Sequence, residues 1–187
     1  MEKIPVQKIA GVLKGLVMMT LACNLIALFL VPGLVLTKGL GDLPAPYENL
    51  LELPLRVLAV WALSWKWVWQ AGIYEMVLTL FLLFSGCCTA VILWQARRVL
   101  QTILRGEPFA PSNAVSLRRA AGFCFLIAGA ALARVIFSVC YYRSPLPLAT
   151  YNALFVPMFA MGGLLCLVMS ALFRQAAELK AENDLTI

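Results

Sequence analysis

Four long runs of apolar residues, separated by clusters of charged residues, dominate the chain. A helix that spans a bilayer needs about 20 mostly apolar residues. Runs of this kind predict four membrane-spanning helices, at 16–36, 75–96, 120–142 and 150–173. We therefore expect an all-α integral membrane protein, a four-helix bundle formed by a single domain over residues 1–187.

Composition supports a membrane location. The chain is 63% hydrophobic and only 13% charged, whereas about a quarter of the residues of a soluble domain are charged. The first apolar run follows Lys3, Lys8 and Lys14, which resemble the basic start of a signal peptide. The run is too long for a signal peptide and no small-residue cleavage site follows it, so we expect it to remain as the first span.

The basic residues are distributed unevenly between the two ends of the predicted spans. If the N-terminus is cytoplasmic, the cytoplasmic side holds Lys3, Lys8, Lys14, Arg97, Arg98, Arg105, Arg118, Arg119, Arg174 and Lys180. The outer side then holds only Lys38, Arg56, Lys66 and Arg143. Short cytoplasmic loops carry an excess of lysine and arginine. The bias therefore predicts that both termini are cytoplasmic.

The segment 38–72 connects the first two spans and mixes apolar residues with charges. Four tryptophans, Trp61, Trp65, Trp67 and Trp69, crowd its end. Tryptophan favours the headgroup region of a bilayer, so we expect an outer amphipathic helix that lies on the membrane. Two alternatives remain for residues 47–70. One is a fifth span or re-entrant segment, and the other is a short strand, indicated by the alternation at positions 65, 67 and 69.

The second span is predicted to continue as a helix beyond the membrane, as far as Arg105. Gly106 is typical of the left-handed residue that ends a helix, and Pro108 prevents an immediate restart. Ser112 or Asn113 can then cap the next helix. A cytoplasmic helical hairpin over residues 97–119 follows from this pattern.

Arg134 interrupts the third span and is the sharpest feature inside the predicted bilayer. Charges within a membrane are usually paired and face other helices. Glu75 is the expected partner, because the second and third spans are antiparallel neighbours, and Asn152 can contribute from the fourth span. One interpretation is a structural ion pair; the other is a ligand-binding or sensing site open to the outside.

Small and polar residues indicate where the spans approach one another. Pairs of small residues four positions apart let helices pack closely, and the spans contain three such pairs: Gly86 and Ala90, Gly129 and Ala133, and Gly162 and Cys166. Asn24 within the first span is expected to hydrogen-bond to another helix.

The sequence indicates no catalytic or metal site. It contains no histidine and six cysteines, and all six lie in apolar runs. A reactive cysteine needs an electropositive, partly exposed setting, so we expect these cysteines to pack as small hydrophobic residues. We predict no enzyme activity, no cofactor and no direct contact with nucleic acid.

The polar cytoplasmic segments form the predicted contact surface. The hairpin 97–119 is rich in arginine, and the tail 174–187 carries acidic residues. The candidate contact residues are Arg97, Arg98, Arg105, Phe109, Asn113, Arg118, Arg119, Lys180, Glu182, Asn183 and Asp184. Contact with anionic lipid, with a cytoplasmic protein, or between hairpin and tail would each use this surface.

The same segments carry a resemblance to a known family. In the hairpin the shared positions are Gly106, Pro108, Phe109, Asn113, Leu117, Arg118 and Gly122. In the tail they are Leu179, Lys180, Glu182, Asn183, Asp184, Leu185 and Thr186. The chain resembles the YoaS-like bacterial membrane protein family, DUF2975. The resemblance implies a four-span protein of the bacterial inner membrane, with no assigned activity. It also implies a neighbouring small helix-turn-helix regulator as a cytoplasmic partner.

Two functional hypotheses follow. The first is a non-enzymatic membrane regulator or sensor that contacts a cytoplasmic partner through the hairpin and tail. The second is a small oligomeric transporter or permeation accessory with a polar site at Arg134 and Glu75. Against the second, the first and fourth spans carry almost no ionisable residues to line a pathway.

Overall fold

The computed structural model describes residues 5–35, 53–70 and 72–184. These residues are almost entirely helical. In chain order the elements are α1 (Pro5–Val35), α3 (Leu53–Gln70), α4 (Ile73–Leu104), α5 (Pro111–Tyr142), the short 3₁₀ helices η1 (Leu146–Ala149) and η2 (Tyr151–Leu154), and α6 (Phe155–Asp184).

Four of these helices are long and apolar enough to cross a membrane. The spanning candidates are Gln7–Val31 in α1, Ile73–Leu104 in α4, Pro111–Tyr142 in α5 and Asn152–Asn183, which includes α6. The predicted all-α class with four membrane helices is confirmed. The helices extend beyond the predicted spans because polar stretches such as 97–104 and 174–184 continue the same helices.

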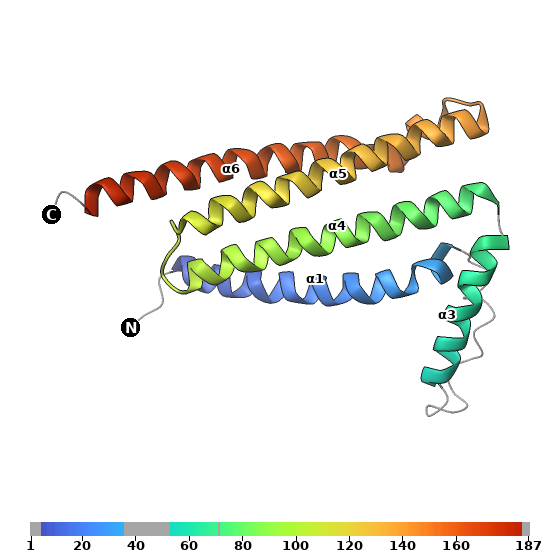
Figure 1. Ribbon diagram of the computed structural model, residues 1–187, viewed down its shortest axis with the longest axis horizontal. Coiled ribbons are helices and arrows are strands. Elements are labelled where there is room, and N and C mark those ends of the chain that lie inside the picture. The colour runs from blue at the N-terminus through green and yellow to red at the C-terminus, as the bar shows by residue number, and fades with distance from the viewer. Residues whose placement is uncertain (1–4, 36–52, 71, 185–187) are drawn as a thin grey trace.

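The four long helices lie side by side in the order α1, α4, α5 and α6 (Figure 1). Extensive contacts join chain neighbours: α1 with α4, α4 with α5, and α5 with α6. Short connections make consecutive helices antiparallel neighbours. We call the end that carries both chain ends and the α4–α5 turn the terminal face, and the opposite end the α3 face.

α5 provides most of the core because it has a helix on each side. Ala121 and Ile127 have no exposed surface, and Ala131 is 1% exposed. The alanines let α4 and α6 approach the α5 backbone closely, and Ile127 fills the space between the helices. The outer sides of α1 and α6 carry large exposed apolar residues such as Leu25 and Leu165, which suit contact with lipid.

α3 lies steeply across the end of α1 at the α3 face and extends beyond the row of long helices on the side away from α5 and α6 (Figure 1). The Trp61 ring stacks on Phe29 of α1 with a centroid separation of 4.8 Å and an interplanar angle of 5°. Ser64 and Val68 are buried. The segment is therefore a helix, and the strand interpretation is wrong for residues 53–70. α3 is not among the four spanning candidates. Residues 38–52 of the predicted outer segment lie outside the described part of the chain.

α1 and α4 make one close polar contact. The Asn24 Nδ2 donates a hydrogen bond to the Gly86 carbonyl oxygen at 3.0 Å, which confirms the predicted bond between helices. A Cβ on Gly86 would lie 2.6 Å from Cδ2 of Leu28. By contrast, among the described residues no atom lies within 4 Å of a Cβ placed on Gly129 or Gly162. Gly86 thus marks a close approach of two helices, whereas Gly129 and Gly162 do not.

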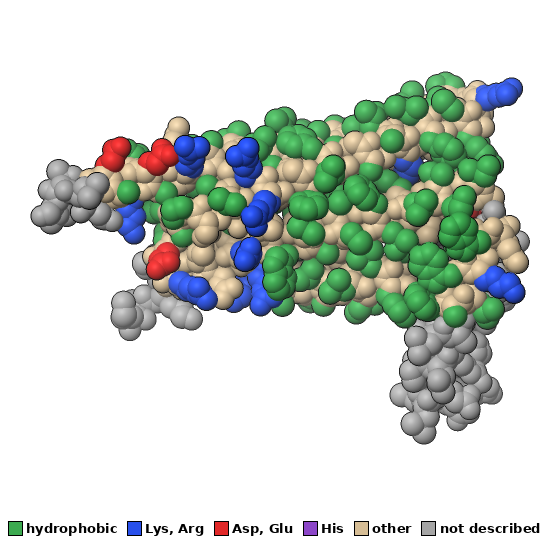
Figure 2. Space-filling model, viewed as in Figure 1, with side chains coloured by type: hydrophobic (Ala, Val, Ile, Leu, Met, Phe, Trp, Pro, Cys, Tyr) green, Lys and Arg blue, Asp and Glu red, His purple; other side chains and the backbone are tan. Residues whose placement is uncertain are grey.

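Charged and apolar side chains occupy separate zones along the helices. Figure 2 shows basic side chains in a belt near the terminal face and a broad apolar zone between this belt and the α3 face. Along α5, the stretch from Arg119 to Tyr142 is about 34 Å long at ~1.5 Å per residue. This length matches a hydrocarbon core of about 30 Å. The apolar zone is therefore thick enough to span a bilayer.

Candidate functional site

Arg134 lies on α5 within the apolar zone, with its side chain half-buried. Its guanidinium carbon is 4.5 Å from the centroid of the Phe81 ring of α4. Stacking on an aromatic face is favourable for a guanidinium and leaves its N–H donors free at the edge. The planar group therefore has one apolar contact and five donors still to satisfy.

A cavity of 390 Å³ opens beside Arg134 toward the α3 face. Its lining is mostly polar or aromatic: Tyr74, Arg134, Val135, Ser138, Tyr142, Ser144, Leu146, Pro147, Thr150 and Asn152. The structure therefore brings Asn152 to the same site as Arg134, as expected. Tyr74 and Tyr142 contact each other with a centroid separation of 5.4 Å.

Glu75 does not join this site. Its Oε2 lies 2.7 Å from the position that a Cβ on Gly72 would occupy, so the carboxylate turns back toward the start of α4. Within the described residues Arg134 makes no ion pair with Glu75. The Phe81 ring occupies the α4 side of the guanidinium instead. The predicted polar site thus consists of Arg134 and Asn152 without the acidic partner.

Arg134 and Asn152 also border a second space, a groove of 320 Å³ between α1 and the start of α6. α1 contributes Asn24, Ala27, Leu28 and Val31, and α4 contributes Ser85 and Gly86. α1 and α6 make no extensive contact in the described part of the chain, so the groove follows the seam between them. Arg134 stands where the outer cavity and this groove meet.

At the terminal face, α4 ends in a compact turn around Gly106. Gly106 has a φ of +85°, the left-handed conformation that costs glycine least. Its N–H donates to the Ile103 carbonyl oxygen at 3.1 Å, and the Glu107 N–H donates to the Thr102 carbonyl oxygen at 3.1 Å. These two bonds form a Schellman motif. The predicted helix end at Gly106 is confirmed.

Asn113 holds the hairpin together from the inside. It is 1% exposed. Its Nδ2 donates to the Pro108 carbonyl oxygen at 2.8 Å, and its Oδ1 accepts a hydrogen bond from the Thr102 hydroxyl at 2.7 Å. α5 begins at Pro111, and no side chain caps it. The prediction that Ser112 or Asn113 caps α5 is therefore wrong, and the amide of Asn113 instead stabilises the turn.

The arginines of the hairpin divide between two separate hollows. Arg118 and Arg119 are consecutive on α5, so their side chains leave the helix about 100° apart. Arg119 lines a pocket between α4 and α5, whereas Arg118 lines a groove between α5 and α6. The contact surface expected from the sequence is thus divided between two neighbouring hollows on α5, and Val115 lines both of them.

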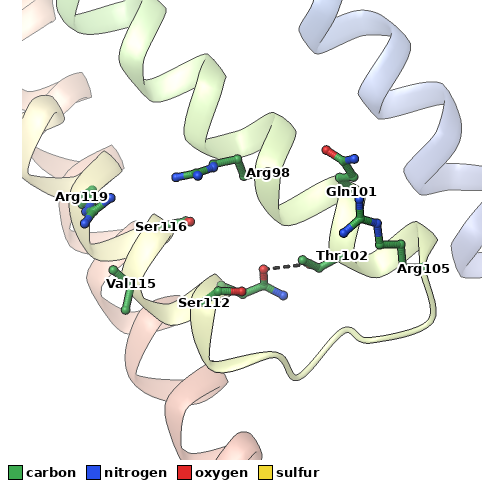
Figure 3. A pocket seen from close by; sticks show the side chains of 9 residues that line it. Arg98, Gln101, Thr102, Arg105, Ser112, Val115, Ser116 and Arg119 are labelled. Atoms are coloured by element: carbon green, nitrogen blue, oxygen red, sulfur yellow. Dashed lines mark hydrogen bonds between the residues drawn. The ribbon is translucent and has the colours of Figure 1, made fainter.

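The first hollow, the arginine pocket, has a volume of 380 Å³. It is lined by Arg98, Gln101, Thr102, Arg105, Ser112, Asn113, Val115, Ser116 and Arg119. None of these lining residues is acidic. Figure 3 shows Arg98 extending from α4 toward α5 and the Ser116 hydroxyl facing the space between the two helices.

The second hollow, the α5–α6 groove, has a volume of 650 Å³. It is lined by Pro111, Ala114, Val115, Arg118, Leu167, Ser170, Ala171, Arg174, Ala177, Glu178 and Ala181. The Ser170 hydroxyl donates to the Ala114 carbonyl oxygen at 2.7 Å and fixes α6 against α5. Arg174 Nε lies 2.9 Å from the Oε1 of Glu178 within α6.

The remaining predicted contact residues lie around these hollows. Arg97 stacks over the Trp94 ring at 4.8 Å, at the edge of the apolar zone. Phe109 is 47% exposed in the turn. Lys180, Glu182 and Asn183 are exposed on the last turns of α6. The side chain of Asp184 lies outside the described part of the structure.

Metal ligands do not gather anywhere in the described ranges. No group of three or more His, Cys, Asp or Glu side chains there could hold a metal ion. All six cysteines are free thiols.

Comparison with known proteins identifies one family. The family described as proteins of unknown function, DUF2975, matches residues 45–187. This match includes α3 to α6, both hollows of the terminal face and the Arg134 cavity. No curated protein and no solved structure matches the chain.

Proposed function

Since the chain belongs to the DUF2975 family of proteins of unknown function, we propose that this multi-pass membrane protein is a non-enzymatic regulator that binds a cytoplasmic protein at its terminal face. The partner would occupy the α5–α6 groove and the exposed end of α6. The resemblance found in the sequence suggests a small helix-turn-helix regulator as this partner.

The proposal places the terminal face in the cytoplasm of a bacterium. The supporting observation is the belt of basic side chains at this end (Figure 2), since lysine and arginine accumulate on the cytoplasmic side of membrane proteins. The α3 face, with Trp61 and Trp65 of α3 and the Tyr74–Tyr142 contact, would then meet the outer headgroups. Aromatic residues of this kind are enriched at membrane interfaces.

The end of α6 is the observation that carries the proposal. α6 continues to Asp184. It therefore extends about ten residues, or ~15 Å, beyond Arg174. The residues from Glu178 to Asn183 are all exposed, and Leu179 is 66% exposed. A helix that only spans a membrane does not need an ordered extension, because free chain ends are normally loose.

The chemistry of the groove defines the partner. Ala114, Ala177 and Ala181 leave room for apolar side chains, and Arg118 is exposed at its edge. An amphipathic helix with small apolar groups on one side and an acidic residue beside them would fit this groove. Binding of a helix in a groove is a common form of peptide recognition.

Site-specific photo-crosslinking in intact cells tests the proposal. A photoreactive amino acid at Ala181, which lines the groove, should capture a cytoplasmic protein. The same amino acid at Leu165 of the same helix, 64% exposed in the apolar zone, should capture none. Ala177→Trp fills the groove without a change in charge, so it should abolish the product at position 181.

The outcomes separate a docking site from random contact. A product at both 181 and 165, or a product at 181 that persists in Ala177→Trp, would contradict a specific partner in the groove. Expression and membrane insertion of Ala177→Trp are checked by the amount of full-length protein in the membrane fraction. Ala177 is only half-buried at the rim, so this substitution should leave the fold intact.

A polar permeation site is the second candidate. The observation that favours it is that Arg134 borders both the outer cavity and the α1–α6 groove. A second copy of the chain at the seam between α1 and α6 would enclose this route. Uptake of small carboxylates into liposomes, present with the wild type and absent with Arg134→Leu, would support transport. No uptake with either protein would eliminate it.

A further inference from the structure

The arginine pocket between α4 and α5 has a chemistry distinct from that of the α5–α6 groove. We propose that it binds a phosphate group, either the headgroup of an anionic lipid or inorganic phosphate. The inference goes beyond the proposed function, because it needs no protein partner and holds for either orientation of the chain in the membrane.

The charged residues that line the arginine pocket are all basic. Arg98, Arg105 and Arg119 surround the pocket, and no acidic residue lines it. Three positive charges that converge on one hollow repel one another when the hollow contains only water. An anion removes that repulsion. Arginine suits phosphate because its planar fork donates two parallel hydrogen bonds to two oxygens.

The floor of the pocket supplies an unused donor. Ser116 is 7% exposed, and its hydroxyl makes no hydrogen bond to another described residue. The hydroxyl faces the space between α4 and α5 (Figure 3). The Ser116 oxygen is not among the buried polar atoms without a partner, so it still reaches the solvent of the pocket and is free to donate a hydrogen bond to an anion oxygen. Ser116 thus adds a neutral hydrogen-bond donor to the arginines that line the pocket.

The start of α5 adds a third contribution. No side chain caps this helix at Ala110, and Ser112 of its first turn lines the pocket. Pro111 has no N–H, and the Asn113 N–H donates to the Ala110 carbonyl oxygen at 2.9 Å, so the contribution of this helix start is mainly its partial positive charge, which favours an anion. Asn113 is held by Thr102 and Pro108, so the helix start is fixed in place before any ligand arrives.

The position of the pocket suggests which phosphates can reach it. Arg119 stands at the terminal end of the apolar zone, about one bilayer thickness from Tyr142 on the same helix. Lipid headgroups lie at this level. Basic pockets between membrane helices are known sites for anionic headgroups. The pocket also opens at the terminal face, where soluble phosphate has access.

Binding to purified full-length protein in detergent tests the inference. Phosphatidylglycerol and phosphatidylcholine are compared by native mass spectrometry, and sodium phosphate is titrated calorimetrically in chloride buffer. Phosphatidylglycerol should be retained in preference to phosphatidylcholine. Arg98→Gln with Arg119→Gln should weaken binding roughly 30-fold, since each basic group near an anionic surface contributes a factor of roughly five.

Two further variants separate a built site from general charge. Lys8→Gln with Lys14→Gln removes the same charge from α1 at the same face and should weaken binding less than threefold. Ser116→Ala keeps every charge and should still weaken binding several-fold. Both variants change side chains that no described hydrogen bond uses, so folding should be preserved.

The two ligand arms identify the source of the phosphate. Retention of phosphatidylglycerol that depends on Arg98 and Arg119 assigns a lipid headgroup. Binding of sodium phosphate alone, lost in the same double variant, assigns soluble phosphate. If neither phosphatidylglycerol nor sodium phosphate binds, or if the arginine and lysine double variants weaken binding equally, the inference is overturned.

Discussion

The guanidinium carbon of Arg134 lies 4.5 Å from the centroid of the Phe81 ring, across the interface between α5 and α4. This contact replaces the ion pair with Glu75 that the sequence suggested. An aromatic face contributes about 0.5–2 kcal/mol to the stability of a cation. An arginine at the centre of a membrane helix costs roughly 2.5–3.5 kcal/mol on insertion scales. The contact alone therefore does not offset the cost of the charge.

Arg134→Leu should consequently leave the free energy of unfolding unchanged or raise it by about 1 kcal/mol, because the insertion cost exceeds the stacking energy. Thermal unfolding in detergent micelles measures the change. Arg143→Leu is the matched control, since Arg143 is exposed at the end of α5. A loss of stability in Arg134→Leu that Arg143→Leu does not share would mean that Arg134 is part of the structural framework.

Asn113→Ala should destabilise the terminal face. The substitution removes the hydrogen bonds to Thr102 and Pro108, which hold the turn between α4 and α5. We expect a loss of about 1–3 kcal/mol in the free energy of unfolding. Ser112→Ala, at the neighbouring exposed position, should be nearly silent. Equal effects of the two substitutions in urea or thermal unfolding would contradict a structural role for Asn113.

Substitution of Gly106 by alanine tests its left-handed backbone conformation, and Gly122 provides a matched control. Gly106 has φ +85°, and no described atom lies within 4 Å of its Cβ position. The same open space surrounds Gly122, which has ordinary helical geometry within α5. Gly106→Ala should cost about 1 kcal/mol through backbone strain alone. Gly122→Ala should instead gain up to about 1 kcal/mol. The two melting temperatures should move in opposite directions.

Gly86→Ala tests the close approach of α1 and α4. The added methyl would lie 2.6 Å from Cδ2 and 2.9 Å from Cγ of Leu28, so Leu28 must shift. The shift would also disturb the Asn24 hydrogen bond to the Gly86 carbonyl oxygen. We expect a loss of about 1–3 kcal/mol from overpacking. Gly129→Ala, with open space at its Cβ position, should not destabilise. Equal stability of the two variants would contradict the described interface.

The sequence predicted features that depend on local periodicity. The apolar runs located α1, α4, α5 and α6, Gly106 marked the end of α4, and Asn24 in an apolar run indicated a bond between helices. These predictions succeeded because each needs only the pattern around one residue. The burial of Asn113 was missed, since its partners Thr102 and Pro108 become near only when the turn has formed.

Contacts between distant positions could not be predicted in the same way. Phe81 and Arg134 lie far apart in the sequence, and an apolar span offers many aromatic residues for the same role. Glu75 was chosen for its charge, although its place in the first turn of α4 draws it toward the helix start. The division of Arg118 and Arg119 between two hollows was accessible from helical geometry, because consecutive residues project about 100° apart.

The orientation of the terminal face is the premise of the proposed function, and a pair of reporter fusions measures it directly. Green fluorescent protein is fused after Ile187 in one protein, and alkaline phosphatase is fused there in a second. In a third protein, alkaline phosphatase is inserted in the turn at Ser144. If the terminal face is cytoplasmic, the C-terminal fluorescent protein should fluoresce, the C-terminal phosphatase should be inactive and the phosphatase at Ser144 should be active. An active phosphatase at the C-terminus, with none at Ser144, would place α6 and the hairpin outside the cell and contradict a cytoplasmic partner.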